Sequence, residues 1–194
     1  MPKRPDDYME DRRDRILDAV ELCCREKGWN QTTLRDVAAV AGLSKGGLYV
    51  HFATKTQLLE EILRRNVERI ESLGKPTDPE AFIAYLQQNV LHVAGPEGRE
   101  GAIAQGELQL DGVRNPDLRP LVEAVARKAV SVLEGVVRKF RPGLEPEEVT
   151  DRALAILFLL EGLRNYVGMS GNASVEQLQR VLARQVRAIL HGRP

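Results

Sequence analysis

Residues 33–55 read TLRDVAAVAGLSKGGLYVHFATK, and this stretch decides the fold of the N-terminal region. Thr33 and Asp36 have the spacing of a capping box, and the apolar residues after them share one face of a short helix. Gly42 allows a tight turn, because glycine adopts a left-handed backbone without strain. Ser44 then caps a second short helix. Two short helices around such a turn predict a helix-turn-helix, a motif that reads DNA.

The outer face of the second helix carries the residues that would meet DNA. Helical spacing turns its apolar residues inward and leaves polar and side-chain-free positions outside, where the major groove would lie. Residues near the starts of the helices would add phosphate contacts, because the N–H groups there attract anions. The candidate DNA-binding residues are Thr33, Arg35, Ser44, Lys45, Gly46, Gly47, Tyr49, His51 and Lys55.

Four of these positions have a structural interpretation beside the functional one. Thr33 and Ser44 are helix caps first, and a phosphate contact would be a second role for the same helix ends. Gly46 and Gly47 each cost about 1 kcal/mol in a helix. Either they let the backbone lie close to base edges, or a one-turn helix held by its cap and core contacts tolerates them.

The charged and aromatic candidates also have a structural alternative to DNA binding. Lys45 is either a DNA contact or plain surface. Tyr49 and His51 have polar tips that suit phosphate hydrogen bonds, with partial core packing as the alternative. Lys55 stands in the first turn of the next helix, where the helix dipole disfavours a cation, and a nearby phosphate would reverse that penalty.

The amino-acid sequence of this stretch resembles the DNA-binding signature of the TetR (tetracycline-repressor-like) family. The similarity lies in GLSKG at 42–46, LYVHF at 48–52, Lys55, and Leu58 with Leu59. Upstream positions that also resemble the family are Ile16, Leu17, Ala19, Leu22, Gly28, Thr32 and Thr33. The resemblance covers about the first third of the chain, and beyond it only LLEGL at 159–163 looks similar.

The resemblance implies a two-domain regulator of transcription. It implies a helix-turn-helix domain over residues 1–53 and a helical ligand-binding and dimerisation domain over 54–194, joined by a helix at 54–73. It further implies a homodimer on a palindromic double-stranded DNA operator, most simply a repressor that a small-molecule effector releases. The alternative is a small-molecule-binding or interaction protein whose helix-turn-helix no longer binds DNA specifically.

The rest of the chain predicts an all-α protein, because helical periodicity recurs and no strand-like alternation appears. Capping and proline signals place helices over 54–73, from Asp78–Pro79 to Leu91, and over about 102–110, after a Gly/Pro-broken loop at 95–101. Further signals predict a long helix ending near Phe140, another from Pro146, and a last one capped by Ser174 with Gln177. Residues 75–77 form the predicted domain boundary.

The last two predicted helices bear on assembly. Residues 153–167 are apolar nearly all round, and the final helix has one apolar face. That face consists of Val175, Leu178, Val181, Leu182, Val186, Ile189 and Leu190. The pair is either core or half of an intermolecular four-helix bundle, and the resemblance implies the bundle. With Leu182 in the seam, a charge there would dissociate the dimer.

An effector site in the second domain is predicted from polar residues inside apolar stretches, because such groups are costly when unpaired. The candidates are Phe82, Tyr85, Leu86, Asn89, Gln105, Leu108, Phe158, Glu161, Arg164, Asn165 and Tyr166. Their mostly apolar character favours a hydrophobic or amphipathic ligand. Arg164 either pairs an anionic ligand or pairs Glu161 one turn earlier on the same helix.

Composition excludes several classes of protein. The 194 residues carry 28 basic and 28 acidic side chains, so the formal net charge is zero. DNA binders are usually basic, and the expected resolution is local: basic residues line the reading face while acids of the first helix point elsewhere. No stretch is long and apolar enough for a membrane span, and no secretory leader is expected, because residues 1–14 contain no apolar segment. A cytoplasmic protein is therefore expected.

Neither catalysis nor a metal site is expected. The three histidines are far apart, and no HExxH, Walker loop, nucleophile elbow or metal-ligand spacing occurs. The only cysteines, Cys23 and Cys24, are neighbours about 100° apart on a helix and are poorly placed to bridge or chelate. One is expected in the core and the other partly exposed. No cofactor is predicted.

Overall fold

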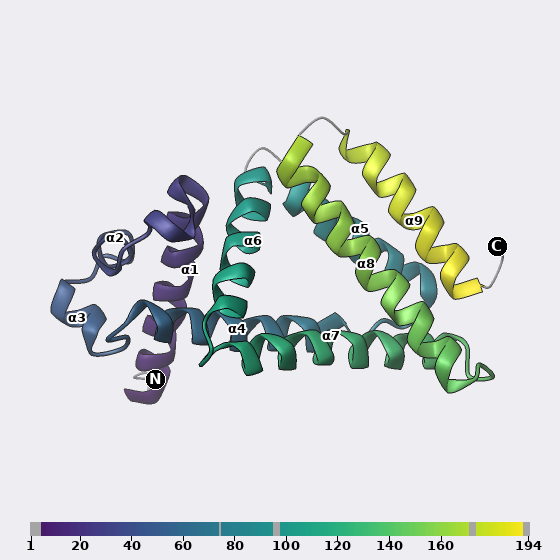
Figure 1. Ribbon diagram of the computed structural model, residues 1–194, viewed down its shortest axis with the longest axis horizontal. Helices are drawn as coiled ribbons and strands as arrows, with labels where there is room; N and C mark the ends of the chain where they lie inside the picture. The colour runs from purple at the N-terminus through teal and green to yellow at the C-terminus, as the bar shows by residue number, and fades with distance from the viewer. Residues whose placement is uncertain (1–4, 74, 95–97, 171–173, 192–194) are drawn as a thin grey trace.

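A computed structural model describes residues 5–73, 75–94, 98–170 and 174–191. These residues form nine helices and no strand, which confirms the all-α prediction (Figure 1). The helices are α1 (Pro5–Gln31), α2 (Leu34–Val40), α3 (Lys45–Tyr49), α4 (Lys55–Leu73), α5 (Pro79–Ala94), α6 (Gly98–Arg114), α7 (Arg119–Phe140), α8 (Pro146–Ser170) and α9 (Val175–His191). No helix in the described part of the chain is long and apolar enough to cross a bilayer.

The first three helices form the predicted helix-turn-helix head. Helix α1 breaks at Gly28, which has a φ of +79°, and the chain then turns into α2. Gly42, with a φ of +67°, makes the turn between α2 and α3. Both are glycines in the left-handed region, where other L residues are strained. In Figure 1 the head lies at the end of the molecule opposite the C-terminus.

One hydrophobic core holds the head and also reaches into the second domain. Ile16 and Val20 of α1, Leu48 of α3 and Leu58 of α4 are fully or almost fully buried in it. Ala104 and Leu108 of α6 and Leu118 before α7 complete the same cluster. The head is therefore packed against α6 by shared apolar burial, which is the main stabilising force available to it.

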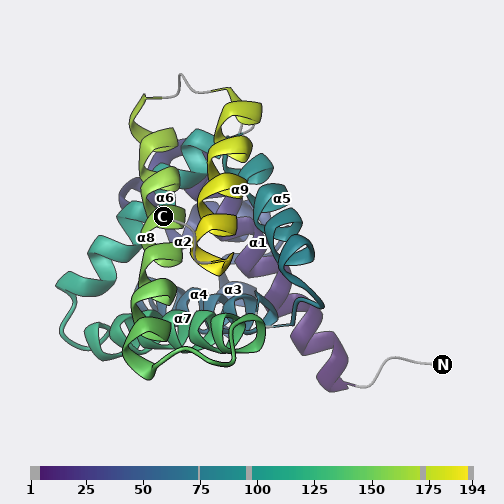
Figure 2. The same cartoon turned by 90° about the vertical axis from the view of Figure 1, so that its right-hand side faces the viewer.

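A second core lies among α5, α7, α8 and α9. Figure 2 shows α5, α8 and α9 side by side on one side of the molecule, with α7 running across their lower ends. Phe82 and Leu86 of α5 pack there with Leu133 of α7, Ile156 of α8 and Leu182 of α9. The apolar face of α9 therefore covers its own chain. The prediction that Leu182 lies in an intermolecular seam is wrong, because this side chain is 0 % exposed within one subunit.

Helix α6 is longer than the sequence predicts. It begins at Gly98, inside the expected loop, and ends at Arg114 instead of near Leu110. Its first turns pack on α8: Arg99 Nε donates to the Gly168 carbonyl at 3.3 Å, and Ala102 is buried. These tertiary contacts override the weak helix propensity of the glycines, which had favoured a loop.

The cysteine prediction is wrong in one respect. Cys23 and Cys24 are both buried in the core of the head, at 1 % and 2 % exposure. Cys24 faces Thr32, whose hydroxyl lies 4.0 Å from its sulfur, so the residue directly after α1 covers the second thiol. Burial raises the pKa of Cys23 and raises that of Cys24 to about 11.

Candidate nucleic-acid interface

Helix α3 is a single turn that its cap holds in place. The Ser44 hydroxyl accepts a hydrogen bond from the Gly47 N–H at 3.0 Å, and Leu48 is fully buried beneath the helix. The exposed side of this helix carries Lys45, Gly46 and Tyr49. The Lys45 ammonium lies 5.6 Å from the centroid of the Tyr49 ring, within the range of a cation–π contact. These residues project a cation and a phenol from one side of α3.

The two glycines of α3 differ in their surroundings. A Cβ added to Gly46 would meet nothing within 4 Å, whereas one added to Gly47 would lie 3.2 Å from the capping oxygen of Ser44. The fold therefore has a packing reason for glycine at position 47 and none at position 46. An unexplained glycine on an exposed helix face suits close approach of the backbone to another molecule.

The start of α2 adds a second group of candidates. Thr33 and Asp36 form the predicted capping box: the Thr33 N–H donates to the Asp36 carboxylate at 2.8 Å, and the Asp36 N–H donates back at 3.3 Å. The Lys27 ammonium, 2.6 Å away, and then the hydrogen bonds from Thr33 hold the pKa of Asp36 well below its usual range. Thr33 and Arg35 are exposed at this helix end.

His51 is half-buried beside two arginines that the sequence analysis did not select. Burial chiefly, and then the charges of Arg12 and Arg13, lower its pKa. Arg12 also reaches α3, since its Nη2 would lie 3.9 Å from a Cβ on Gly47. The signal in the sequence was the row of arginines in α1 at positions 12, 13 and 15, which places cations toward the helix-turn-helix.

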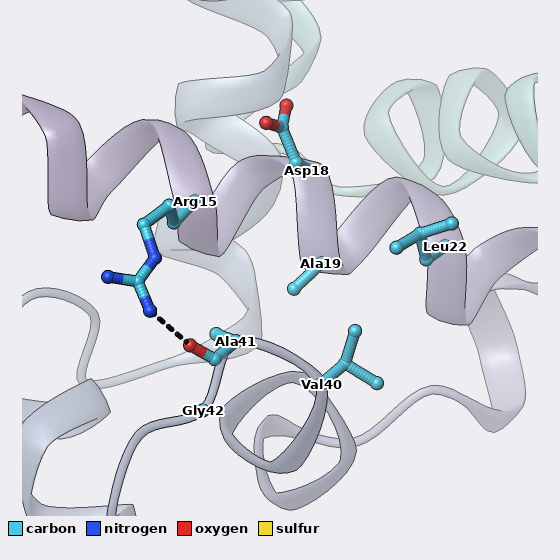
Figure 3. Close-up of a pocket in the computed structure, with 7 residues that line it drawn as sticks. All are labelled: Arg15, Asp18, Ala19, Leu22, Val40, Ala41 and Gly42. Atoms are coloured by element: carbon cyan, nitrogen blue, oxygen red, sulfur yellow. Dashed lines mark hydrogen bonds between the residues drawn. The ribbon is translucent and has the colours of Figure 1, made fainter.

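Arg15 fixes the turn of the motif to α1. Its Nη2 donates to the carbonyl of Ala41 at 3.2 Å, beside Gly42, as the dashed line in Figure 3 shows. The same figure shows Leu22 and Val40 on the two helices that border a shallow depression of about 290 Å³. Because Arg15 satisfies a carbonyl at the end of α2, the orientation of α2 on α1 is set by a specific bond as well as by apolar packing.

Lys55, a predicted DNA contact, has partners within the chain. Its ammonium donates to the Trp29 carbonyl at 2.5 Å and to the Asn30 carbonyl at 3.4 Å, and it lies 4.2 Å from the centroid of the Trp29 ring. Burial is the main cause that lowers its pKa. These carbonyls at the end of α1 already offset the unfavourable dipole at the start of α4. Lys55 therefore has a structural role in the head, and a DNA contact by Lys55 stays a prediction.

The predicted effector residues are not brought into one cavity. Phe82 and Leu86 are buried in the second core, whereas Leu108 is buried in the core of the head. Gln105 is half-buried on α6. Residues on or near the surface are Tyr85, Phe158, Asn165 and Tyr166. The side chain of Asn89 lies outside the described part of the structure.

Arg164 has the partner that the intrahelical alternative predicted. Its Nη2 contacts a carboxylate oxygen of Glu161, one turn earlier on α8. The second domain also has a shallow groove of about 430 Å³ between α7 and α8, lined by Ala126, Arg127, Val130, Ser131, Glu134, Leu154 and Leu157. None of these residues was predicted, and no group of metal-ligating side chains occurs among the described residues.

Comparisons with known proteins define the class. Residues 16–62 match the model of bacterial regulatory proteins of the tetR family, and residues 77–192 match a tetracyclin repressor-like C-terminal domain. The second match alone spans more than half of the chain. The chain therefore belongs to the TetR family, and it is a DNA-binding transcriptional regulator with a ligand-binding C-terminal domain.

Individual relatives agree with this assignment. The HTH-type transcriptional regulator UidR of Escherichia coli (strain K12) is 24% identical over 186 residues, covering 93% of this chain and 91% of that protein. The HTH-type transcriptional repressor KstR2 of Mycolicibacterium smegmatis is 43% identical over 53 residues, 27% of this chain and 26% of its own. A transcriptional regulator of Rhodococcus sp. Rha1 has the same fold, with a TM-score of 0.74 and 24% identity over 93% of this chain and 96% of that one.

Proposed function

We propose that the protein is a dimeric repressor that binds a palindromic operator through α3 and is released from it by a small-molecule effector. The observation that carries the DNA-reading part is the outer face of α3. Lys45, Gly46 and Tyr49 are exposed there, while Ser44 and Leu48 fix the helix from within. Gly47 and His51 lie in or just after α3, and Arg12 reaches this helix. We add the exposed Thr33 and Arg35 at the start of α2 to the proposed contact. A regulator of this kind acts where the genome is, so we place it in the cytoplasm.

We propose that the subunits meet through α8, one of the two helices of the predicted pair, and not through the apolar face of α9, which is buried in its own subunit. Exposed residues of α8 recur at helical spacing along one face: Ala155, Phe158, Gly162, Asn165, Tyr166 and Met169. Phe158 is 66 % exposed and Met169 is 78 % exposed. Large apolar side chains that gather on one face mark a site of association. We assign this α8 face to the contact between subunits, with the outer, more polar side of α9 at its edge.

Two-fold symmetry links this surface to the DNA. A homodimer presents two copies of α3, and two such helices about 34 Å apart fit successive major grooves of one palindrome. The alternative, a binding protein without specific DNA recognition, is not favoured, because the relatives are regulators of transcription.

The effector is proposed to bind the C-terminal domain against α6 and α8. These two helices pack together, and α8 carries the half-buried Glu161–Arg164 pair. A ligand that moves α8 would also move α6, because α6 packs on α8. Hydrophobic acids, acyl thioesters and aromatic compounds are the first candidates, because an apolar body with one polar end suits such a site. A thermal-shift screen would find binders, and a compound that stabilises the protein yet leaves operator affinity unchanged would count against the release mechanism.

The DNA assignment can be tested on a duplex that the protein itself selects. The wild-type protein selects duplexes from a randomised pool, and fluorescence anisotropy then measures the affinity of each variant for the selected duplex. Lys45→Ala and Tyr49→Ala should weaken binding by roughly 10- to 100-fold, the range expected when both subunits lose a bond to a base or a phosphate. Lys75→Ala, an exposed lysine outside the head, is the matched control. Unchanged affinity in both variants would remove α3 as the reader.

A further inference from the structure

The Gly28–Thr32 turn closes α1 beyond its kink, and polar contacts hold it in addition to the burial of Trp29 in the core of the head. The Thr32 hydroxyl donates to the Gly28 carbonyl at 2.8 Å, and the Thr32 N–H donates to the Trp29 carbonyl at 3.1 Å. The φ of +79° at Gly28 interrupts the helix directly before Trp29. A buried N–H needs an acceptor, because leaving it unsatisfied costs as much as a lost hydrogen bond.

The acceptor comes from the other domain. Glu107 of α6 accepts the Trp29 N–H on its Oε2 at 2.6 Å, across 78 positions of sequence. The carboxylate fits closely against the turn, since a Cβ on Gly28 would lie 2.8 Å from the same oxygen. Trp29 itself is 2 % exposed. A short hydrogen bond to an ionised acceptor is among the stronger protein hydrogen bonds.

Lys55 of α4 holds the same turn from its other side. Its ammonium donates to the carbonyls of Trp29 and Asn30 and lies over the Trp29 indole ring. The charges of Asp111 and Glu107 on α6 act favourably on this ammonium. Helices α1, α4 and α6 therefore meet at one turn, with a cation and a carboxylate on its two sides.

Helix α6 also has a fixed opposite end. Arg99 donates to the Gly168 carbonyl of α8, and a Cβ on Gly168 would lie 3.6 Å from the side chains of Ala102 and Ile103. One continuous helix thus runs from a close contact with α8 to the carboxylate at the turn after α1. A shift of α6 along or away from α1 must lengthen the bond between Glu107 and Trp29.

The geometry points to Glu107 as a positioning residue that fixes the DNA-reading head to the C-terminal domain by holding the Gly28–Thr32 turn. The turn leads directly into α2, so the bond sets the direction in which α2 and α3 leave α1. Release of the bond loosens this turn, while the core shared with α6 keeps the head folded. This role rests on the proposed function, because its consequence for DNA is the loss of a fixed spacing between two heads.

The only tryptophan of the chain is Trp29, so its fluorescence reports on this turn alone. In Glu107→Ala, amide exchange at Trp29 should accelerate by about tenfold or more, as expected when a charge-assisted hydrogen bond is removed. The indole emission should change as well. Glu107→Gln keeps an acceptor oxygen without the charge and should fall between wild type and alanine. Glu100→Ala, an exposed glutamate on the same helix, should behave as wild type.

These measurements need neither operator nor effector. Wild-type exchange and wild-type emission in Glu107→Ala would overturn the role of Glu107 in holding the turn. If the alanine variant does not fold, the exchange of Trp29 in Glu107→Gln decides the same question. Lys55→Met provides a second approach from the other side of the turn, and it should also speed exchange at Trp29.

Operator affinity tests whether a looser turn weakens DNA binding. With the duplex selected by the wild-type protein, Glu107→Ala should bind about three- to tenfold more weakly, because DNA must then order a looser head. Altered emission with unchanged affinity would overturn the positioning role. If the wild type selects no duplex, the proposed function fails, and exchange and emission still decide whether Glu107 holds the turn.

Discussion

At the scale of single residues, the structure separates candidates that have contacts within the chain from candidates on the exposed face proposed to bind DNA. Ser44, Gly47 and Lys55 have contacts within the chain that account for them. Lys45 and Gly46 lie on the exposed face of α3. Sequence could predict the caps, because a cap and its target N–H are three residues apart. It could not predict that Lys55 turns to carbonyls about 25 residues earlier, since that contact depends on how α4 packs.

Gly46→Ala separates the two interpretations of this glycine. The added methyl group meets nothing in the protein and replaces a poor helix former, so the free energy of unfolding should stay equal or rise by up to about 1 kcal/mol. Affinity for the selected duplex should fall by tenfold or more if the backbone lies against the bases. Thermal unfolding and anisotropy measure the two effects. Gly135→Ala on α7, equally open, is the control and should leave DNA binding unchanged. Full affinity in Gly46→Ala would support the structural interpretation, in which the short helix simply tolerates this glycine.

His51 predicts a pH dependence with opposite signs for stability and for DNA binding. Its pKa in the folded protein lies below the ordinary 6.5, so below that pH the unfolded chain takes up the proton first and stability falls as pH falls. A phosphate beside the imidazole would raise this pKa, so DNA affinity should rise as pH falls from 7 through the same window. One linked proton limits the change to about tenfold per pH unit in each subunit.

The control for this effect is His51→Gln, which should weaken the pH dependence of both the free energy of unfolding and the DNA affinity. Denaturant titrations and anisotropy at constant ionic strength measure them, because salt screens phosphate contacts strongly. A wild-type affinity that stays constant from pH 7 to 5.5 would exclude His51 from the phosphate contacts.

At the scale of helices, local signals predicted where elements begin and long-range packing decided what they cover. The Ser174 hydroxyl accepts the Gln177 N–H at 3.1 Å, and Asp78 Oδ1 accepts the Ala81 N–H at 2.8 Å, as the capping patterns predict. The start of α6 was missed because its support comes from α8. The apolar face of α9 was recognised, but periodicity does not say whether such a face covers its own subunit or another.

Two substitutions distinguish the core from the subunit contact. Leu182→Glu should unfold the subunit, because it buries an unpaired carboxylate at a fully buried site, a loss of about 3–5 kcal/mol. Phe158→Glu should leave the fold intact and dissociate the dimer, because its site on α8 is exposed within one chain. Circular dichroism and sedimentation velocity separate the two outcomes. A folded, monomeric Leu182→Glu variant, or a fully dimeric Phe158→Glu variant, would contradict the assignment.

At the scale of the whole molecule, two cores are joined by α6, α4 and α7. The sequence predicts a head and a second helical domain, and it predicts α4 as the helix that leaves the head. It does not show that Ala104 and Leu108 of α6 belong to the core of the head. For the same reason the predicted effector set was scattered: Leu108 and Phe82 are both apolar, and only the fold assigns them to different cores.

The alkylation rate of the two neighbouring thiols of α1 can report how often the head opens. Cys23 and Cys24 are the only cysteines in the chain, and both lie in the core of the head. Burial keeps both thiols away from iodoacetamide, and it raises the pKa of Cys24 to about 11, which disfavours the thiolate that reacts. Alkylation should therefore be slower than in urea by about a thousandfold or more, with a rate set by how often the head opens. Bound operator should slow it further, whereas equal rates with and without urea would mean that the head is open in solution.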